Sequence, residues 1–333
     1  MVPFTPDYDL SQLSLRPLSL TPIPIANLSL DPTSPLCPYG DGVLPIRVLT
    51  HNIRYATTSP FKGEQPWAQR KQLLLNELQY ETRHCQETFV CLQEVLYNQL
   101  GDLLAGLNQE AEPEAPEWDY IGVGRDDGHQ SGEYSPIFYR PAIWGLIQWE
   151  TVWLSSTPDR PSKSWDAASI RIVTIGVFTH RQTQNTILVL NTHLDDQGSR
   201  SRLEAARIIL RKIAEYRGRT YDHDGLTSSI SGTVLAGDFN SEEKQEAYQE
   251  LTTSLLDASK AVEGANRYGN YITWTGFGYE DEPPSRIDYV LVDPIVHANR
   301  KIKVDGYAVL GNKFDDGIYC SDHRAVVVDL MLR

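Results

Sequence analysis

Residues 321–330 read Ser-Asp-His-Arg-Ala-Val-Val-Val-Asp-Leu, a polar tripeptide that leads into a run typical of a buried strand. Asp322 and His323 therefore place a hard oxygen ligand beside an imidazole where the strand begins. A hydrolase that attacks phosphate needs both groups, one to help hold a divalent cation and one to contact or protonate phosphate oxygens. Asp-His pairs are also common in ordinary turns, so the tripeptide gains its weight from similar clusters elsewhere in the chain.

Five further polar clusters lie at the ends of separate predicted strands: Asn52, Glu94, His193, the pair Asp238 and Asn240, and Asp288. Active sites of layered α/β folds gather at strand ends in this way. Five independent coincidences are much less probable than one shared site, so we expect these side chains to meet.

Two of the clusters suit a cation. Asn52 can coordinate a cation through its carbonyl or donate to phosphate, and Glu94 follows a buried strand, where a carboxylate is well positioned to bind Mg²⁺. Each has an ordinary alternative. Asn52 is also a common turn residue, and Glu94 could stabilise the N-terminus of a following helix.

The other clusters suit acid–base chemistry. His193 could protonate a leaving oxygen, and Asp238 could take a proton from water while Asn240 holds a phosphate oxygen. Asp288 could orient a histidine imidazole. The alternatives are a structural histidine, an Asx turn at Asp238, and a surface salt bridge between Asp288 and Arg286.

The 333-residue chain is acidic, because 30 Lys and Arg residues against 44 Asp and Glu residues give a formal net charge of −14. General affinity for nucleic acid usually rests on a basic surface that releases counterions, so the charge argues against it. A local basic groove and a bound cation can offset the global charge, and a nuclease stays open. The 41% hydrophobic content is enough for a large core.

The cysteines Cys37, Cys85, Cys91 and Cys320 form no CxxC pair, so a structural zinc site is not expected. Cys91 lies in an apolar strand and is expected to be a buried thiol. No transmembrane segment, signal peptide or protein partner is indicated. Secreted and cytoplasmic locations stay equally open.

Residues 1–37 are rich in Pro, Ser and Leu and are expected to form an extended arm ahead of a single domain over residues 38–333. Helices are predicted at 66–84, 97–107 and 201–216. Ser201 and Glu204 are expected to form a capping box at the start of the last helix.

Strands alternate with these helices, and a flexible loop is expected over 227–232. The strands are predicted at 46–53, 89–93, 120–123, 137–139, 143–154, 170–178, 186–190, 233–236, 271–274, 287–292, 302–309 and 325–330. Runs of strands interrupted by a few helices predict an α/β fold of two sheets covered by helices.

Taken in order, the clusters from Asn52 to His323 resemble the endonuclease/exonuclease/phosphatase superfamily. That group includes pancreatic-type deoxyribonucleases, apurinic endonucleases, deadenylases, neutral sphingomyelinases and inositol polyphosphate 5-phosphatases. The resemblance covers residues 46–330. It implies a four-layer α-β-β-α sandwich of two mixed sheets flanked by helices, and Mg²⁺- or Mn²⁺-dependent hydrolysis of a phosphoester.

The resemblance implies a metal end formed by Glu94, as principal ligand, with Asn52 and Asp322 in support. It implies that Asp288 orients the second active-site histidine, His323. The remaining matches are His193 as the first active-site histidine, Asp238 and Asn240 as the pair that positions water and phosphate, Glu133 as the carboxylate partner of the first histidine, and Arg171 as a phosphate-binding arginine. A solvated strand-edge arginine is an equally good description of Arg171.

The chain also departs from the family pattern. Ser131 stands where deoxyribonucleases carry a phosphate-contacting tyrosine, which weakens a DNA-groove interpretation. Arg54 stands where several members carry an acidic residue near the metal, which leaves one versus two cations open. The segment 284–288 lacks the Trp-Cys of inositol 5-phosphatases. Arg125 and Trp274 fall in stretches expected to line the substrate pocket, with loop packing as their alternative.

We therefore expect a Mg²⁺-dependent phosphodiesterase, with a nucleic acid as the leading substrate. The alternative is a small phosphoester, such as a phospholipid headgroup, a sugar phosphate or an inositol phosphate. A non-catalytic ligand-binding member is an alternative of another class, although such a protein has no need to keep both histidines with their carboxylates.

Overall fold

The computed structural model describes residues 42–112, 115–223, 225–278, 283–294 and 302–333. The predicted arm over residues 1–37, and Cys37 with it, lies outside the described residues. No helix in the described ranges is both long enough and apolar enough to cross a membrane.

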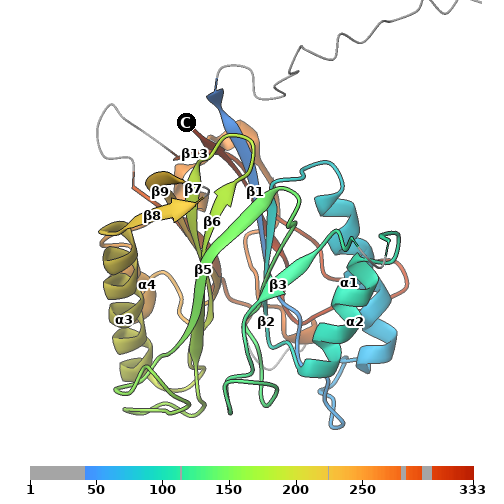
Figure 1. Ribbon diagram of the computed structural model, residues 1–333. Helices are drawn as coiled ribbons and strands as arrows, with labels where there is room; N and C mark the ends of the chain where they lie inside the picture. The colour runs from blue at the N-terminus through green and yellow to red at the C-terminus, as the bar shows by residue number, and fades with distance from the viewer. Residues whose placement is uncertain (1–41, 113–114, 224, 279–282, 295–301) are drawn as a thin grey trace, which may run out of the picture. The chain divides into compact units, whose positions relative to one another are not determined.

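Two mixed sheets face each other with helices on their outer faces (Figure 1). This confirms the predicted α-β-β-α sandwich. The first sheet has the order β11-β13-β14-β1-β2-β4-β3. Its strands are β1 (Leu44–Asn52), β2 (Thr88–Gln93), β3 (Asp119–Ile121), β4 (Ile137–Tyr139), β11 (Arg267–Gly269), β13 (Ile302–Val309) and β14 (Val326–Leu332).

The second sheet has the order β10-β12-β9-β7-β6-β5, with β8 paired to β9. Its strands are β5 (Trp144–Trp153), β6 (Ile172–His180), β7 (Thr186–His193), β8 (Thr220–His223), β9 (Leu226–Asp238), β10 (Leu256–Asp257) and β12 (Asp288–Val292). β2, β6 and β7 are buried along their whole length. Strands covered on both faces read as continuous apolar runs, which is why their sequences are so readily recognised.

Helices α1 (Trp67–Thr82) and α2 (Tyr97–Leu107) cover the first sheet. Helices α3 (Ser199–Arg217), α4 (Glu246–Leu251) and α5 (Ala258–Ala261) belong to the second half of the chain, and α3 packs Ala206, Ile209 and Ile213 on the second sheet. Between the sheets, the ring of Phe89 lies 4.7 Å from Trp144 and 4.9 Å from Phe178. Cys91 is fully buried, as predicted.

Three local predictions were wrong. Residues 227–232 belong to β9, which forms a hairpin with β8, and residues 271–274 form only isolated bridges at Trp274. Ser201 does not cap α3. Its hydroxyl donates to the Gly198 carbonyl, and its backbone N–H donates to the carboxylate of Asp166 (2.7 Å), which lies in a distant loop.

Strand register brings the site together. In the second sheet Asp238 pairs with His193 on one side and with Asp288 on the other. In the first sheet Asn52 pairs with Gln93, next to Glu94, and Thr50 pairs with Val326 at the start of β14. The predicted site residues therefore lie at one end of both sheets.

Candidate active site

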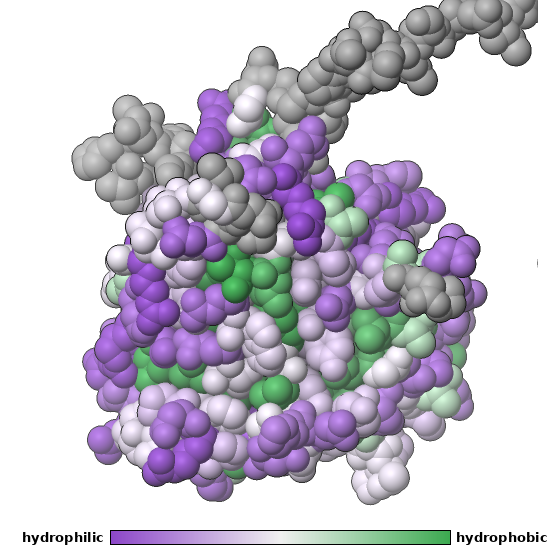
Figure 2. All heavy atoms as spheres, viewed as in Figure 1, coloured by the Kyte–Doolittle hydropathy of each residue, from purple (hydrophilic) through white to green (hydrophobic). Residues whose placement is uncertain are grey.

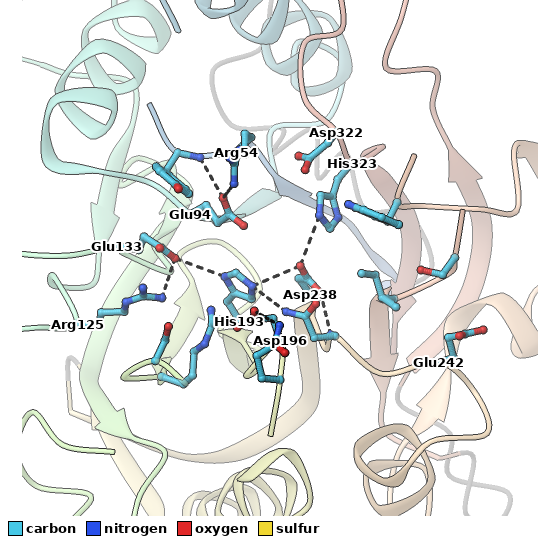
Figure 3. A pocket seen from close by; sticks show the side chains of 18 of the residues that line it. Arg54, Glu94, Arg125, Glu133, His193, Asp196, Asp238, Glu242, Asp322 and His323 are labelled. Atoms are coloured by element: carbon cyan, nitrogen blue, oxygen red, sulfur yellow. Dashed lines mark hydrogen bonds and ion pairs between the residues drawn. The ribbon is translucent and has the colours of Figure 1, made fainter. Parts of the chain in front are cut away.

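A cavity of about 670 Å³ opens at this end of the sandwich (Figure 3). The predicted site residues that line it are Glu94, Arg125, Glu133, Arg171, His193, Asp238, Asn240, Trp274, Asp322 and His323. The other two, Asn52 and Asp288, lie directly behind the lining and hydrogen-bond to it. All side chains that the sequence suggested for one site are thus brought to one cavity.

A buried chain of acids and imidazole connects the two sheets. Nδ1 of His323 lies 2.9 Å from Oδ2 of Asp288, and its Nε2 lies 3.7 Å from Oδ2 of Asp238. All three residues are almost inaccessible to solvent. Burial alone would lower the pKa of His323, but Asp288 and Asp238 outweigh it and raise the pKa to about 10. His323 is therefore an imidazolium at neutral pH in the protein without ligands.

Asn52 ties the ends of the two sheets to each other. Its Nδ2 donates to Oε1 of Glu94 (3.0 Å) and to Oδ2 of Asp238 (3.0 Å), while its Oδ1 accepts the N–H of Arg54 (3.0 Å). Arg54 and Glu94 both have positive φ, 57° and 59°. Non-glycine residues are uncommon there, and such strain clusters at functional sites.

His193 sits in a different electrostatic environment from His323. Nδ2 of Asn240 donates to its Nε2 (3.0 Å), and Oε2 of Glu133 lies 3.7 Å from its Nδ1. Burial and the nearby guanidinium of Arg171 lower the pKa of His193 to about 4. His193 is therefore neutral at physiological pH. The site holds one charged and one neutral imidazole, both within 3.7 Å of the Asp238 carboxylate.

In the segment 237–240, Asp238 forms an Asx turn and also faces the catalytic cavity together with Asn240. Oδ1 of Asp238 accepts the backbone N–H of Asn240 (2.8 Å), which is an Asx turn, and this turn aims the Asn240 amide at His193. Gly237 has φ of 147°, and a Cβ there would lie 2.0 Å from the carbonyl oxygen of Thr192. The glycine is therefore required by close approach to β7.

Each of the arginines that line the cavity faces a carboxylate. Arg125 Nη1 donates to Glu133 (2.8 Å), and Arg171 Nη2 donates to Asp196 (2.8 Å). Nε of Arg125, Nη1 of Arg171 and Nδ1 of His193 are buried without a hydrogen-bond partner among the described residues. Buried polar nitrogens left without a partner are costly, so this corner of the cavity is chemically suited to an anionic or oxygen-rich group.

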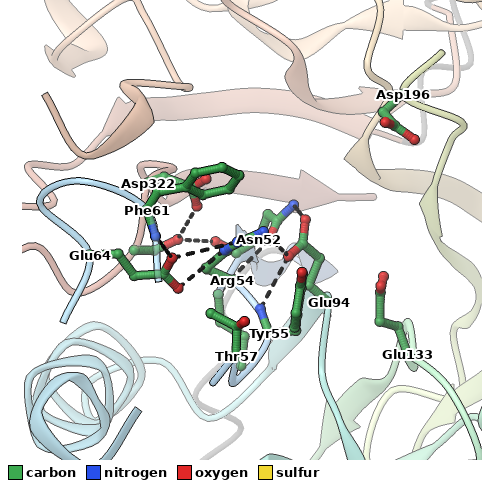
Figure 4. A network of polar contacts seen from close by, with 12 residues as sticks. Asn52, Arg54, Tyr55, Thr57, Phe61, Glu64, Glu94, Glu133, Asp196 and Asp322 are labelled. Carbon is green, nitrogen blue, oxygen red and sulfur yellow. Dashed lines mark hydrogen bonds and ion pairs between the residues drawn. The ribbon is translucent and has the colours of Figure 1, made fainter. Parts of the chain in front are cut away.

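Arg54 stands between acidic groups and aromatic rings (Figure 4). Its Nε donates to Glu64 (3.2 Å), its Nη1 lies 3.7 Å from Glu94, and its guanidinium lies 4.3 Å from the Tyr55 ring centroid and 4.8 Å from that of Phe61. Ion pairing and ring stacking fix this side chain. A permanent positive charge therefore occupies the position next to Glu94.

Arg70 was missed by the sequence interpretation. It is fully buried on α1, where it donates to the carbonyls of Gln65, Ile53, Arg54 and Cys320. It thus joins the end of β1 to the segment just before Ser321. The available signal was its position three residues after Trp67 and four before Leu74, on the buried face of the helix.

The alternative of a surface salt bridge between Asp288 and Arg286 is not realised, and Ser131 lies outside the cavity lining. Arg286 pairs with Asp257 (2.9 Å) and Glu243 (2.7 Å), so it forms no surface salt bridge with Asp288. Ser131 belongs to an exposed turn, where its N–H donates to Asp127.

The donor set fits a divalent cation. Glu94 and Asp322 offer hard oxygen ligands, and burial together with the nearby Glu94 raises the pKa of Asp322. Within the described residues, one group of acidic and histidine ligand atoms lies within 4.8 Å of one another, at Asp238, Asp288 and His323, and this group could also hold a metal ion. Both nitrogens of His323 already face carboxylates there, whereas the Glu94 carboxylate accepts hydrogen bonds from Asn52 and from the N–H of Tyr55.

The sequence model of the Endonuclease/Exonuclease/phosphatase family matches residues 49–323, and the chain belongs to this family. Its members are hydrolytic phosphoesterases, so the expected enzyme class is confirmed. The expected identity of the family, derived from the order of the polar clusters, is confirmed as well.

Solved structures with the same fold come from Bacteroides thetaiotaomicron. A mannosyl-6-phosphatase is 32% identical, with 86% of this chain and 99% of that chain covered and a TM-score of 0.70. An endonuclease/exonuclease/phosphatase family protein is 30% identical, with 87% and 99% covered and a TM-score of 0.73.

A curated relative is the CCR4-Not complex 3'-5'-exoribonuclease subunit Ccr4 of Debaryomyces hansenii. It is 24% identical over 258 residues, which is 71% of this chain. The match spans 30% of the length of that relative.

Proposed function

We propose that this protein is a divalent-cation-dependent phosphatase that acts on a small sugar phosphate. The observation that carries this proposal is the pairing of the cavity's arginines: Arg54 with Glu64, Arg125 with Glu133, and Arg171 with Asp196. Cations that already face carboxylates do not form the continuous basic track that a nucleic-acid backbone requires. They support one anionic subsite surrounded by hydrogen-bonding groups.

The other residues that line the catalytic cavity can form hydrogen bonds with the hydroxyl groups of a sugar. Carboxylates such as Asp196 and Glu242 and the amide of Gln245 accept or donate hydrogen bonds, and Trp274 offers a ring. The similarity to a mannosyl-6-phosphatase at 32% identity supports the same substrate class. The similarity to the exoribonuclease subunit Ccr4 favours a second candidate, a nuclease, which was the leading expectation from the sequence.

In the proposed mechanism, Glu94 and Asp322 would hold a single Mg²⁺ or Mn²⁺, and the Asn52 amide keeps Glu94 in place. The cation supplies Lewis-acid stabilisation of a phosphate oxygen when bound. Arg54, fixed beside Glu94, takes the place of a second cation.

Asp238 orients water for in-line attack and accepts its proton as the new P–O bond forms and the P–O bond to the sugar breaks. The sugar oxygen leaves as a hydroxyl after taking up a proton from solvent. The imidazolium of His323, oriented by Asp288, stabilises the charge that develops on the phosphate oxygens. Asn240 and neutral His193, with Glu133 nearby, hold another oxygen, and Arg171, Arg125 and Trp274 position the substrate.

A substrate panel tests this proposal. Inorganic phosphate release would be measured from mannose 6-phosphate, glucose 6-phosphate and an inositol phosphate, and nucleotide release from single-stranded RNA and DNA, each with Mg²⁺ or with EDTA. We expect the highest kcat/KM on a hexose phosphate, and no turnover in EDTA. A kcat/KM that is higher on RNA or DNA than on every sugar phosphate would overturn the substrate assignment.

A further inference from the structure

A groove separate from the catalytic cavity lies at the side edge of the sandwich, between the edge strands of the two sheets. β3 ends the first sheet and β5 ends the second. The groove has a volume of about 530 Å³. Its aromatic side chains are Tyr97, Tyr120, Tyr134, Tyr139 and Trp149, and we call this feature the aromatic groove.

The position of Trp149 follows from a defect in β5. The register of β5 against β6 shifts between Leu146 and Gln148, after which Trp149 lies opposite Gly176. Opposite residues of an antiparallel pair point to the same face of the sheet. A Cβ on Gly176 would lie 2.6 Å from Cδ1 of Ile121 in β3, so this face looks toward the other sheet. The bulge therefore turns a tryptophan toward the inter-sheet gap at an edge where the gap is open.

Two of these five rings are partly exposed, whereas those of Tyr134 and Tyr139 are buried. Trp149 is 41% exposed and Tyr97, at the start of α2, is 51% exposed. In Figure 2 weakly hydrophilic and hydrophobic residues run down the middle of this face, between β5 and β3, with strongly hydrophilic residues on either side. An exposed patch with large rings and a polar rim marks a binding surface.

The charge of the groove restricts its ligand. Apart from tyrosines, its ionisable lining residues are Asp119 and His129, and no lysine or arginine lines it within the part of the chain that the structure describes. A polyanion would find no counter-charge there. Aromatic faces rimmed by phenols, with Gln130 beside them, match the mixed apolar and hydroxyl surface of a neutral sugar.

One compact turn contributes side chains both to the aromatic groove and to the catalytic cavity. Arg125 and Glu133 face the catalytic cavity, whereas His129 and Gln130 line the groove. The turn is held by backbone hydrogen bonds from Arg125 N to Glu133 O (3.1 Å) and from Gly124 N to His129 O (3.0 Å). A ligand that crosses this turn would place one end in each site.

We propose that the aromatic groove binds neutral sugar residues of a phosphorylated glycan whose terminal sugar phosphate occupies the catalytic cavity. This inference rests on the proposed phosphatase function and extends it from a monosaccharide to an oligosaccharide. Trp149 is the central stacking residue and Tyr97 its partner. Neither contacts the reacting phosphate.

The test compares phosphate release from 6-phosphorylated mannotriose and from mannose 6-phosphate. We expect Trp149→Ala to lower kcat/KM on the trisaccharide about tenfold and to leave the monosaccharide unchanged, as is typical for loss of an aromatic anchor. Tyr268→Ala serves as the matched control, because Tyr268 is an exposed aromatic on β11 outside the groove. An equal effect of Trp149→Ala on both substrates would overturn the proposal.

Binding of unphosphorylated mannotriose, followed by tryptophan fluorescence and by NMR, tests the groove without any reliance on catalysis. Saturable binding that Trp149→Ala abolishes supports the groove even if the protein has no phosphatase activity. Absence of binding at millimolar mannotriose, with normal hydrolysis of mannose 6-phosphate, rejects the groove and leaves the proposed function intact. Binding of hexauridylate in place of the sugar would also reject it, because the groove would then stack bases.

Discussion

Nδ1 of His323 lies 2.9 Å from Oδ2 of Asp288, although the residues are 35 positions apart in the sequence. This hydrogen bond joins the first residue of β12 in one sheet to the segment that precedes β14 in the other. The catalytic proposal depends on this link, because it fixes the charge and direction of the imidazolium.

Asp288→Asn should preserve the fold and remove most of the activity. The amide cannot stabilise the imidazolium, so the pKa of His323 falls and the ring loses its preferred orientation. We expect kcat to fall by roughly 10²–10⁴ with little change in KM. Steady-state kinetics on the best sugar phosphate measures this, with Asp159→Asn, an exposed carboxylate, as control. Activity of Asp288→Asn within about threefold of wild type would show that the link is structural only.

Arg70→Met should destabilise the protein and loosen the site. In this variant four buried backbone carbonyls lose their hydrogen-bond donor. Loss of a buried charged partner of this kind lowers the free energy of unfolding by about 3 kcal/mol or more. Urea unfolding measures the free energy of unfolding. Arg83→Met, at the exposed end of the same helix, is expected to change it by less than about 0.5 kcal/mol. Similar free energies of unfolding for the two variants would contradict the stabilising role of the Arg70 hydrogen bonds.

His193 should stay neutral as the pH falls through the usual range of a histidine. Its folded-state pKa of about 4 lies below the unfolded value of about 6.5. The neutral form therefore stabilises the fold fully above pH 6.5, and this contribution is lost as the pH falls toward 4. NMR titration of the imidazole signal, assigned with His193→Asn, reports the pKa directly.

The same NMR titration of His193 in the Arg171→Gln variant tests the cause of the low pKa. Arg171 helps to lower the pKa of His193, so its removal should raise that pKa measurably. A wild-type pKa near 6.5, or one that Arg171→Gln leaves unchanged, would refute the electrostatic assignment.

One divalent cation should bind, with Glu94 as its main ligand. Calorimetry with Mg²⁺ or Mn²⁺ is expected to give a stoichiometry near one for the wild type and no measurable binding for Glu94→Gln, because a carboxylate ligand becomes a neutral amide. Glu242→Gln, a lining residue away from Glu94, is the control. Two equivalents of bound metal would argue against Arg54 as the substitute for a second cation.

Most of the fold and site could be predicted from the sequence because their signals are local. Buried strands such as β6 and β7 read as apolar runs, and His193, Asp238 and Asp288 each lie at the end of such a run. What was missed depends on distant contacts. Asp166 caps α3 from 35 residues away, and the β8–β9 hairpin contains too many serines to show a strand pattern.

The position of a residue in the sequence does not show which contacts its side chain makes in the folded protein. Arg70 sits on a buried helical face like its apolar neighbours, and only the folded chain shows the carbonyls that it binds. The bulge that turns Trp149 toward the aromatic groove leaves no mark on the local sequence, because it is defined by the register with β6.

The reaction that we propose for this site is metal-dependent hydrolysis of a sugar phosphate, with Asp238 as the group that activates water. Phosphate release from mannose 6-phosphate by the wild type and by Asp238→Asn, each with Mg²⁺, tests it most directly. We predict clear wild-type turnover that EDTA abolishes, and a kcat/KM lower by about three orders of magnitude or more in Asp238→Asn. Wild-type activity that Asp238→Asn retains, or an absence of wild-type turnover on this and related sugar phosphates, would contradict it.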